Sequence, residues 1–196
     1  MRRDVVTSLI AIVFLTVVFG LLYPLAFTGV AQVLFHGKAN GSRLTEAERL
    51  VGSSLIGQDF QGKRRYFQSR PSATGYDAAV TAFSNLGPNS RAEEHSVRSN
   101  LASYLKLNRP YDRGLTRADV PIDAVTQSGS GVDPDISEAN ARIQAHRVAQ
   151  VRRLPLSLVM HMISDHTDGR FLGVFGEPGV GVLELNLALD REASSR

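Results

Sequence analysis

One stretch of the chain has the residue spacing of a phosphate-binding loop. In that motif a glycine-rich turn cradles phosphates, a lysine contacts them, and the next residue is Ser or Thr, whose hydroxyl holds Mg²⁺. Gly57, Gly62 and Lys63 have this spacing, but Arg64 stands where the hydroxyl is needed. Phe60 is also a bulky side chain for a loop folded around phosphate. We therefore interpret the stretch as a polar turn after a strand.

A second loop has the small residues that an anion site uses. Its members are Ser128, Gly129, Ser130 and Gly131. Backbone N–H groups of such a loop can surround an anion, and the positive end of the helix predicted to follow would attract it. Asp133 and Asp135 lie at that helix end and would repel phosphate. Local chemistry therefore favours capping of the helix by these acids over anion binding.

The side chains that a metal site or a covalent catalyst needs are scarce. The chain has no cysteine, which excludes disulfides, zinc ribbons, iron–sulfur clusters and thiol catalysis. None of its five histidines has another four residues away, and the nearest two, His161 and His166, point to different faces of a helix. No Gly-x-Ser-x-Gly motif is present. We predict no metal site and no catalytic residue in this chain.

One group of aromatic and arginine side chains is suited to a protein interface. Tyr66, Phe67, Arg70 and Tyr76 are of the types that are enriched in the centres of interfaces. The alternative is an ordinary core with a surface arginine. We predict that Tyr66, Phe67 and Arg70, together with Asn85, contact a partner subunit.

Composition limits the classes of protein that remain. Among 196 residues, 43% are hydrophobic and 21% are charged, which excludes a disordered chain. The 22 Lys and Arg against 19 Asp and Glu leave a formal net charge of only +3, and the basic residues are scattered. Nucleic-acid binding needs a basic patch or stripe, so we do not expect it. The length has room for one domain and an appendage.

The amino-terminal segment is long and apolar enough to cross a lipid bilayer. No charged side chain occurs from Val5 to Phe35, and about 20 apolar residues in a helix span a hydrocarbon core of roughly 30 Å. We predict a membrane anchor over residues 1–35, with Pro24 kinking its helix. The anchor residues include Val5, Leu9, Val13, Val17 and Leu21. A cleaved signal peptide is the alternative, but its apolar part is about 7–15 residues and therefore shorter.

The rest of the chain is predicted to lie outside the cytoplasm. Arg2 and Arg3 make the amino end positive but are offset by Asp4, and Lys38 and Arg43 follow the apolar segment, so the charges on its two sides are close to balanced. Short basic ends stay on the cytoplasmic side, whereas long domains are translocated largely regardless of charge. We predict a cytoplasmic amino terminus, a connector at 36–50, an extracytoplasmic domain at 51–190 and a tail at 191–196.

Sequence periodicity predicts a mixed α+β domain after the transmembrane helix. Ser90 with Glu93 forms a capping box before a helix at 91–107, and Ser137 caps a helix at 138–153. The other expected elements are a bent strand at 50–57, a loop at 75–88, a strand at 120–125, a loop at 126–135, a short helix at 158–163, a strand at 171–175 and a closing strand at 185–189. The last of these also fits a helix.

Short motifs along the whole chain resemble one protein family. They are, in order, SLIGQ at 54–58, YF at 66–67, RPSA at 70–73, SNLGP at 84–88, VT at 125–126, SGSG at 128–131, DP at 133–134, IS at 136–137, Gln144, RVA at 147–149 and LELN at 183–186. With one amino-terminal membrane helix, this set resembles the C subunit of bacterial Kdp potassium-transporting ATPases. Departures from the family pattern occur at Ala82, Phe83, Asp135 and Gly181 and concern local loop shape.

The resemblance implies a place in a multisubunit pump of the bacterial inner membrane. The partners would be a channel-like A subunit that selects K⁺, a P-type B subunit that hydrolyses ATP, and a small F subunit. The complex would use ATP, Mg²⁺ and K⁺, whereas we expect this chain to bind no cofactor firmly. The family's C subunit is described as an assembly factor and as a catalytic chaperone that raises the ATP affinity of the B subunit. This chain lacks the phosphorylation motif Asp-Lys-Thr-Gly, so it cannot run the ATPase alone.

Three roles remain open. In the first, the chain is an accessory subunit of the pump. Its extracytoplasmic domain cannot touch cytoplasmic ATP, so it would change the ATP affinity of the B subunit through coupling between distant sites. Alternatively, the chain contacts ATP itself, with Gln144, Arg147 and the 128–131 loop as candidates. The third role is a free-standing, membrane-anchored binding or sensor domain outside any pump.

Overall fold

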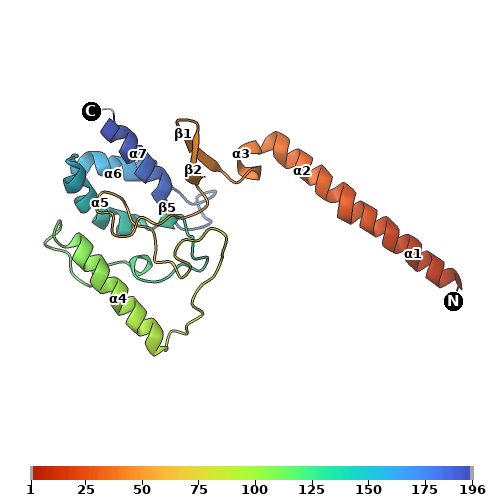
Figure 1. Cartoon of the computed structure of the whole chain (residues 1–196), viewed down its shortest axis with the longest axis horizontal. Helices are drawn as coiled ribbons and strands as arrows, with labels where there is room; N and C mark the ends of the chain where they lie inside the picture. The colour runs from red at the N-terminus through yellow and green to blue at the C-terminus, as the bar shows by residue number, and fades with distance from the viewer. Residues whose placement is uncertain (1, 195–196) are drawn as a thin grey trace. The chain divides into compact units, whose positions relative to one another are not determined.

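The computed structural model describes residues 2–194 and divides into two compact units, Met1–Val51 and Gly52–Arg196 (Figure 1). They are unit 1 and unit 2. Unit 1 is mainly one helix, and unit 2 is a mixed domain of helices and short strands. This confirms the predicted fold class of one amino-terminal helix followed by a mixed α/β domain.

Unit 1 begins with a continuous helix that is long and apolar enough to cross a membrane. It comprises α1 (Arg2–Val17), the π-helical turn η1 (Val18–Leu22) and α2 (Tyr23–Leu34). The combined helix has 33 residues; an 18-residue window within it has a mean hydropathy of 2.8, and no residue of that window is buried. The predicted anchor residues Val5, Leu9, Val13, Val17 and Leu21 are all exposed. Covering these side chains requires lipid or another protein.

The helix continues through Pro24 instead of ending there. Proline has no N–H, and its ring crowds the carbonyl four residues earlier. The wider π-helical turn lies immediately before it, where the Tyr23 N–H donates to the Val18 carbonyl, five residues back. The disturbance predicted at Pro24 therefore takes the form of a π-helical turn.

The segment predicted as a connector, 36–50, contains regular structure. Helix α3 (His36–Ala39) is followed by β1 (Arg43–Glu46) and β2 (Arg49–Ser53), which form a two-stranded sheet. The predicted strand at 50–57 thus ends at Ser53, and turns follow it.

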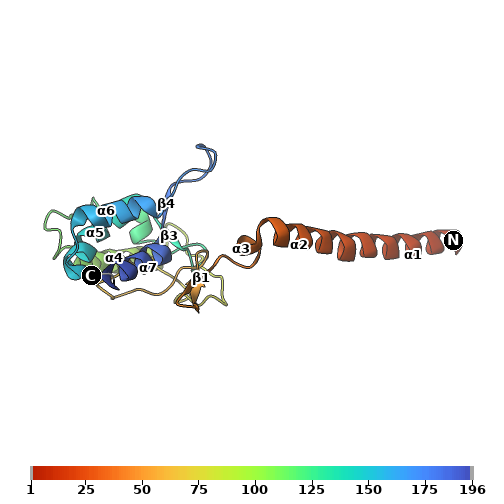
Figure 2. The same cartoon turned by 90° about the horizontal axis from the view of Figure 1, so that it is seen from above.

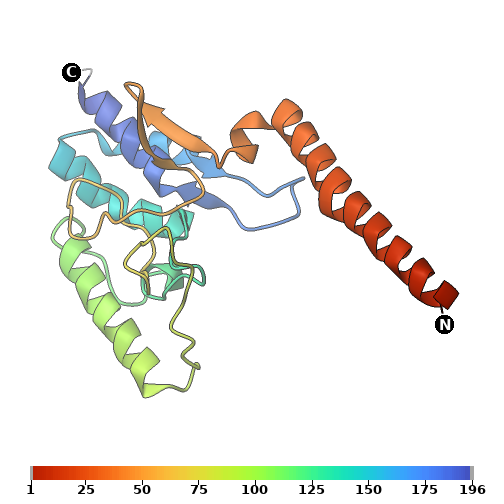
Figure 3. The same cartoon turned by 45° about the vertical axis from the view of Figure 1, so that its right-hand side comes forward.

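Unit 2 is built around helix α5 (Glu138–Arg152). Helix α4 (Arg91–Asn108) lies on one side of it, and α6 (Leu156–Asp165) and α7 (Val182–Ser194) lie on the other (Figure 3). Both serines cap their helices: Ser90 Oγ accepts from the Ala92 N–H at 3.2 Å, and Ser137 Oγ accepts from the Asn140 N–H at 3.1 Å. The predicted reciprocal bond of Glu93 is replaced, because the Ser90 N–H donates to the Gly87 carbonyl at 2.9 Å. The helices predicted at 91–107, 138–153 and 158–163 are confirmed.

A small antiparallel sheet completes unit 2. Its strand order is β3 (Asp135–Ile136), β5 (Gly179–Gly181), β4 (Thr167–Asp168). Val180 of the central strand pairs with Ile136 on one side and with Thr167 on the other.

Three predicted strands are wrong. Residues 120–125 contain the 3₁₀ helix η2 (Ile122–Ala124), because Pro121 starts a tight turn rather than an extended segment. Residues 171–175 form the tip of a hairpin whose apolar side chains are exposed. The closing strand at 185–189 is part of α7, where Val182, Leu185 and Leu189 recur at helical spacing and are all buried.

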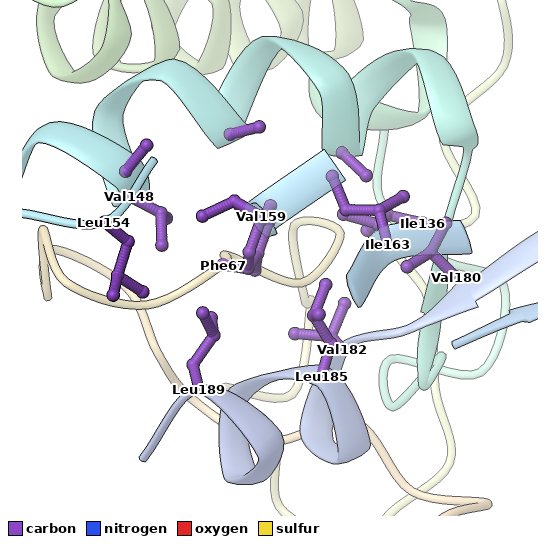
Figure 4. Packing of buried hydrophobic residues seen from close by; sticks show 13 residues of the cluster. Phe67, Ile136, Val148, Leu154, Val159, Ile163, Val180, Val182, Leu185 and Leu189 are labelled. Carbon is purple, nitrogen blue, oxygen red and sulfur yellow. The ribbon is translucent and has the colours of Figure 1, made fainter. Parts of the chain in front are cut away.

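The core of unit 2 gathers side chains from α5, α6 and α7 and from the small sheet (Figure 4). Phe67, which belongs to no helix or strand, is fully buried among Val159, Leu185 and other members of this cluster. Burying such a ring contributes about 1.5–3 kcal/mol. A second, smaller cluster joins α4 to η2 through Tyr104, Ala124 and Val125. The predicted tail at 191–196 begins inside α7, and Met1 and residues 195–196 lie outside the described residues.

Candidate functional site

A layer of buried polar side chains crosses unit 2 along the inner face of α5. Asn140, Gln144 and Arg147 are spaced for one helix face, and none exposes more than 1% of its surface. The Gln144 amide pairs with the backbone of Gln68: its Oε1 accepts from the Gln68 N–H at 2.7 Å, and its Nε2 donates to the Gln68 carbonyl at 3.1 Å. The Gln144 side chain thus satisfies both backbone groups of Gln68, as a neighbouring strand would in a sheet.

Helix α7 holds the adjoining residue in the same way. Asn186 Oδ1 accepts from the Phe67 N–H at 2.8 Å, and Asn186 Nδ2 donates to the Phe67 carbonyl at 3.0 Å. The segment 66–68, which belongs to no helix or strand, is therefore clamped between α5 and α7 by two side-chain amides. We call Gln144 and Asn186 the amide clamp.

Arg147 is a fully buried cation without a carboxylate partner among residues 2–194. Its Nη2 donates to the Tyr66 carbonyl at 2.9 Å and to Gln144 Oε1 at 2.8 Å. Its Nε and Nη1 have no acceptor in the described part of the chain. Burial lowers the pKa of Arg147 to about 10, so the guanidinium stays charged at neutral pH. A buried cation of this kind favours a nearby anion or dipole.

At the other end of this polar layer, Asp123 bonds residues at the amino end of α5. Asp123 accepts from Ser137 Oγ at 2.8 Å, from the Ser137 N–H at 2.9 Å and from Asn140 Nδ2 at 3.0 Å. The Tyr104 hydroxyl donates to Asn140 Oδ1 at 2.8 Å, and burial raises the pKa of that hydroxyl far above its usual range. The network therefore runs without interruption from η2 to Arg147.

An open pocket of about 440 Å³ lies over this network, between α4, α5 and the segment that follows β2. Gln68, Tyr104, Asn140 and Gln144 belong to its wall. Its charged lining residues, Arg64 and Lys106, are both basic. The pocket has the polarity and charge that suit an anion with hydrogen-bond acceptors.

The two halves of the predicted ATP-contact group are not brought together at this pocket. Gln144 lines it and Arg147 lies beneath Gln144, whereas the 128–131 loop is absent from its wall. The loop packs instead on 71–74 and on Ala82: the Ser128 N–H donates to the Pro71 carbonyl at 3.0 Å, and the Ala82 N–H donates to the Ser130 carbonyl at 3.2 Å.

Only one glycine of that loop is required by its geometry. Gly131 is buried at φ 76°, and a Cβ there would lie 2.8 Å from the Ala82 carbonyl oxygen. Gly129 is exposed, and a Cβ there would have no neighbour within 4 Å. Ser128 is 1% exposed, and Ser130 Oγ accepts from the Val132 N–H.

The predicted interface residues occupy very different environments. Phe67 is core, and Arg70 is half-buried, with Nη1 3.0 Å from Asp133 Oδ2. Tyr66 is half-buried, and its hydroxyl donates to Asp190 Oδ2 at 2.8 Å. Asn85 is exposed at φ 55°, in the 75–88 loop. An interface role for Tyr66, Arg70 and Asn85 stays a prediction.

Two departures from the family pattern meet at the small sheet. Asp135 and Gly181 are direct partners across β3 and β5. Burial, then Asp133, Asp168 and Glu184, raise the pKa of the Asp135 carboxyl. Among the described residues, no cluster of three or more His, Cys, Asp or Glu side chains is arranged to hold a metal ion.

Comparison with known proteins identifies the family. The family model described as "K+-transporting ATPase, c chain" matches residues 5–191. A Mycobacterium tuberculosis (strain ATCC 25618 / H37Rv) protein named "Potassium-transporting ATPase KdpC subunit" is 47% identical over 194 residues, covering 97% of this chain and 100% of the relative. A Bradyrhizobium diazoefficiens protein of the same name is 41% identical over 208 residues, covering 99% of this chain and 100% of the relative. The chain belongs to the KdpC family of K⁺-transporting ATPase subunits.

Proposed function

We propose that this chain is a non-catalytic accessory subunit that stabilises a potassium-transporting ATPase. Its partners are a channel-like A subunit, an ATP-hydrolysing B subunit and a small F subunit. The observation that carries the proposal is the family match over nearly the full length, which includes the apolar helix as well as unit 2. The sequence has no Asp-Lys-Thr-Gly motif, so the phosphoryl-transfer step belongs to a partner.

Co-purification tests this assignment against a free-standing module. A tagged chain expressed with the whole pump and extracted in mild detergent is expected to retain large membrane partners. A chain that purifies alone under conditions that keep other membrane complexes intact would favour the free-standing binding or sensor domain.

We infer that the helix lies in the bacterial inner membrane with its amino end in the cytoplasm and unit 2 outside. The basic Arg2 and Arg3 support this orientation. The Gly129→Cys variant tests it, because the chain has no other cysteine and Gly129 is exposed without close neighbours. An impermeant thiol reagent is expected to label it in cells whose inner membrane is intact. Labelling only after that membrane is broken would reverse the orientation.

A catalytic-chaperone effect on ATP affinity is proposed to be indirect. Both oxygen and nitrogen of the Gln144 amide are engaged within unit 2, and the 128–131 loop packs on its own neighbours. These groups stabilise the fold, which leaves them little capacity for a nucleotide. An extracytoplasmic unit 2 would then raise ATP affinity through a coupling free energy between sites.

Direct nucleotide binding is the second candidate, and the basic pocket favours it. Arg64 and Lys106 line that pocket, and the buried Arg147 adds positive charge behind it. Photo-labelling of the purified full chain by an ATP analogue separates the two mechanisms. Labelling that is lost in an Arg64→Ala, Lys106→Ala double variant would support direct binding, and no labelling would support coupling.

A further inference from the structure

The hairpin at 169–178, between β4 and β5, carries the most exposed apolar cluster of unit 2. Phe171, Leu172, Val174 and Phe175 form its tip, and each exposes 64–76% of its surface. Figure 2 shows this connection projecting from the rest of unit 2. Such a cluster is unusual on a soluble surface and marks a site of contact with another molecule.

The backbone of the tip is ordered by its own hydrogen bonds. The Phe171 N–H donates to the Phe175 carbonyl at 2.8 Å, and the Phe175 N–H donates back to the Phe171 carbonyl at 3.0 Å. The Val174 N–H also donates to the Phe171 carbonyl, at 3.2 Å, which closes a tight turn. The apolar side chains are therefore presented on a defined turn.

Leu172 occupies a backbone conformation that leucine disfavours. Its φ is 53° and that of Gly173 is 75°, the pair of left-handed residues typical of a tight hairpin turn. Asn, Asp and Gly adopt this conformation readily, whereas leucine is strained there. Because the Leu172 side chain is 76% exposed, packing within unit 2 does not compensate for this strain. A strained apolar residue at an exposed tip suggests selection for binding rather than for stability.

Charge at the base of the hairpin favours a protein over a lipid surface. Arg170, the one basic residue of the hairpin, is neutralised by Glu177, whose two oxygens lie 3.0 Å from Arg170 Nη2. Asp168 ends β4, and Asp135 lies across the sheet beside Gly179. These acids would repel anionic headgroups but complement a basic rim around an apolar groove.

The area available suits part of a subunit interface. An aromatic side chain buries about 150–250 Å² when it is covered, and a stable interface takes about 800 Å² from each partner. The two phenylalanines with Leu172 and Val174 supply a large part of that area, but not all of it. The hairpin is thus an anchor within a larger contact.

We propose that the 169–178 hairpin docks its apolar tip into an apolar, basic-rimmed groove on the extramembrane surface of a membrane partner subunit of the potassium-transporting ATPase. This rests on the proposed accessory-subunit function. The strained Leu172 is the centre of the contact, and Phe171, Val174 and Phe175 surround it.

The test compares Leu172→Asn with Ile122→Asn in the full chain, tagged and expressed with the whole pump. Asparagine suits the left-handed turn, so Leu172→Asn is expected to leave the thermal unfolding of the chain unchanged or shifted upward. The same variant is expected to retain roughly tenfold less partner in mild detergent. Ile122 is 70% exposed on η2, outside the hairpin, and its variant is expected to retain partner as the parent chain does.

Photo-crosslinking identifies the occupant. With benzoylphenylalanine at position 172 of the assembled complex, an adduct with a membrane subunit supports the proposal. An adduct with phospholipid alone, or full retention of partner by Leu172→Asn, overturns it. If the unmodified chain itself retains no membrane partner, the accessory-subunit assignment fails and the hairpin proposal fails with it.

Discussion

Gln144 shows how a single side chain can organise a fold. Its amide bonds both backbone groups of Gln68, a residue 76 positions away, and it also contacts Asn140 and Arg147. All of these groups are buried, so removing the amide leaves them without partners in a place that water does not reach. The cost of an unmade buried hydrogen bond exceeds the gain from making one.

We therefore predict that Gln144→Leu lowers the free energy of unfolding by about 2–4 kcal/mol. Gln150→Leu on the same helix is the matched control, because Gln150 is exposed and its side chain donates to the Tyr111 carbonyl at 3.2 Å. Its effect should stay within about 0.5 kcal/mol. Thermal unfolding of the full chain in detergent measures both. Equal effects would mean that the network contributes little to stability.

The two glycines of the 128–131 loop are predicted to differ in their tolerance of substitution. Gly131→Ala should destabilise unit 2 by about 1–3 kcal/mol, since it combines a left-handed φ with a clash against the Ala82 carbonyl oxygen. Gly129→Ala meets neither obstacle and should change stability by less than about 0.5 kcal/mol. The unfolding midpoints of the two variants decide the matter, and a tolerated Gly131→Ala would contradict the loop geometry.

At the scale of elements, the small sheet predicts a dependence of stability on pH. Asp135 on β3 has a raised pKa in the folded state because of burial and then of Asp133, Asp168 and Glu184. Between its usual pKa and the raised one, the folded state binds more protons than the unfolded state, so stability falls as pH rises through this interval. Asp135→Asn removes the ionisable group.

The variant should therefore be more stable than the parent chain at pH 7, and the difference should vanish below the usual carboxyl range. Unfolding midpoints measured from pH 3 to pH 8 test this, with Glu48→Gln in an exposed turn as the control. A difference that persists unchanged at pH 3 would show that Asp135 acts through packing instead of charge.

Helix caps made part of this fold predictable from sequence, whereas the alternation of apolar residues predicted a strand where the structure has a helix. Ser90 and Ser137 act locally on N–H groups two or three residues ahead, so their effect is visible in sequence. Leu185, Leu187 and Leu189 alternate as in a strand, yet Val182, Leu185 and Leu189 also mark one face of a helix. Tertiary contact decides between these patterns, and short apolar runs do not contain that information.

The candidate site was predictable only in part, for a related reason. The family resemblance pointed to Gln144 and Arg147, but their partners lie in the 66–68 segment, far away in the chain. Asn186 belongs to the LELN motif of the resemblance, but neither it nor Asp123 had a local signal of its buried bonds, since such a side chain looks like any surface polar residue in sequence. The apolar residues at 171–175 predicted a buried strand, whereas in the structure their side chains are exposed at the tip of a hairpin.

At the scale of the whole molecule, the apolar helix is as much a part of the family as unit 2, since the match begins at residue 5. A charge at its centre should therefore be costly. We predict that Val13→Arg lowers the fraction of chain that resists alkaline extraction from membranes, because a central arginine costs about 2.5–3.5 kcal/mol on insertion scales. Val13→Leu is the control. Equal resistance of the two variants would argue against a spanning helix.

The amide clamp has a consequence for hydrogen exchange. The Phe67 and Gln68 N–H groups belong to no helix or strand, yet they donate to the buried oxygens of Asn186 and Gln144. Deuterium can replace these protons only when the segment separates from α7 or α5, which requires unit 2 to open broadly. Two residues of irregular backbone should thus rank among the slowest-exchanging in the chain, alongside the interior of α5.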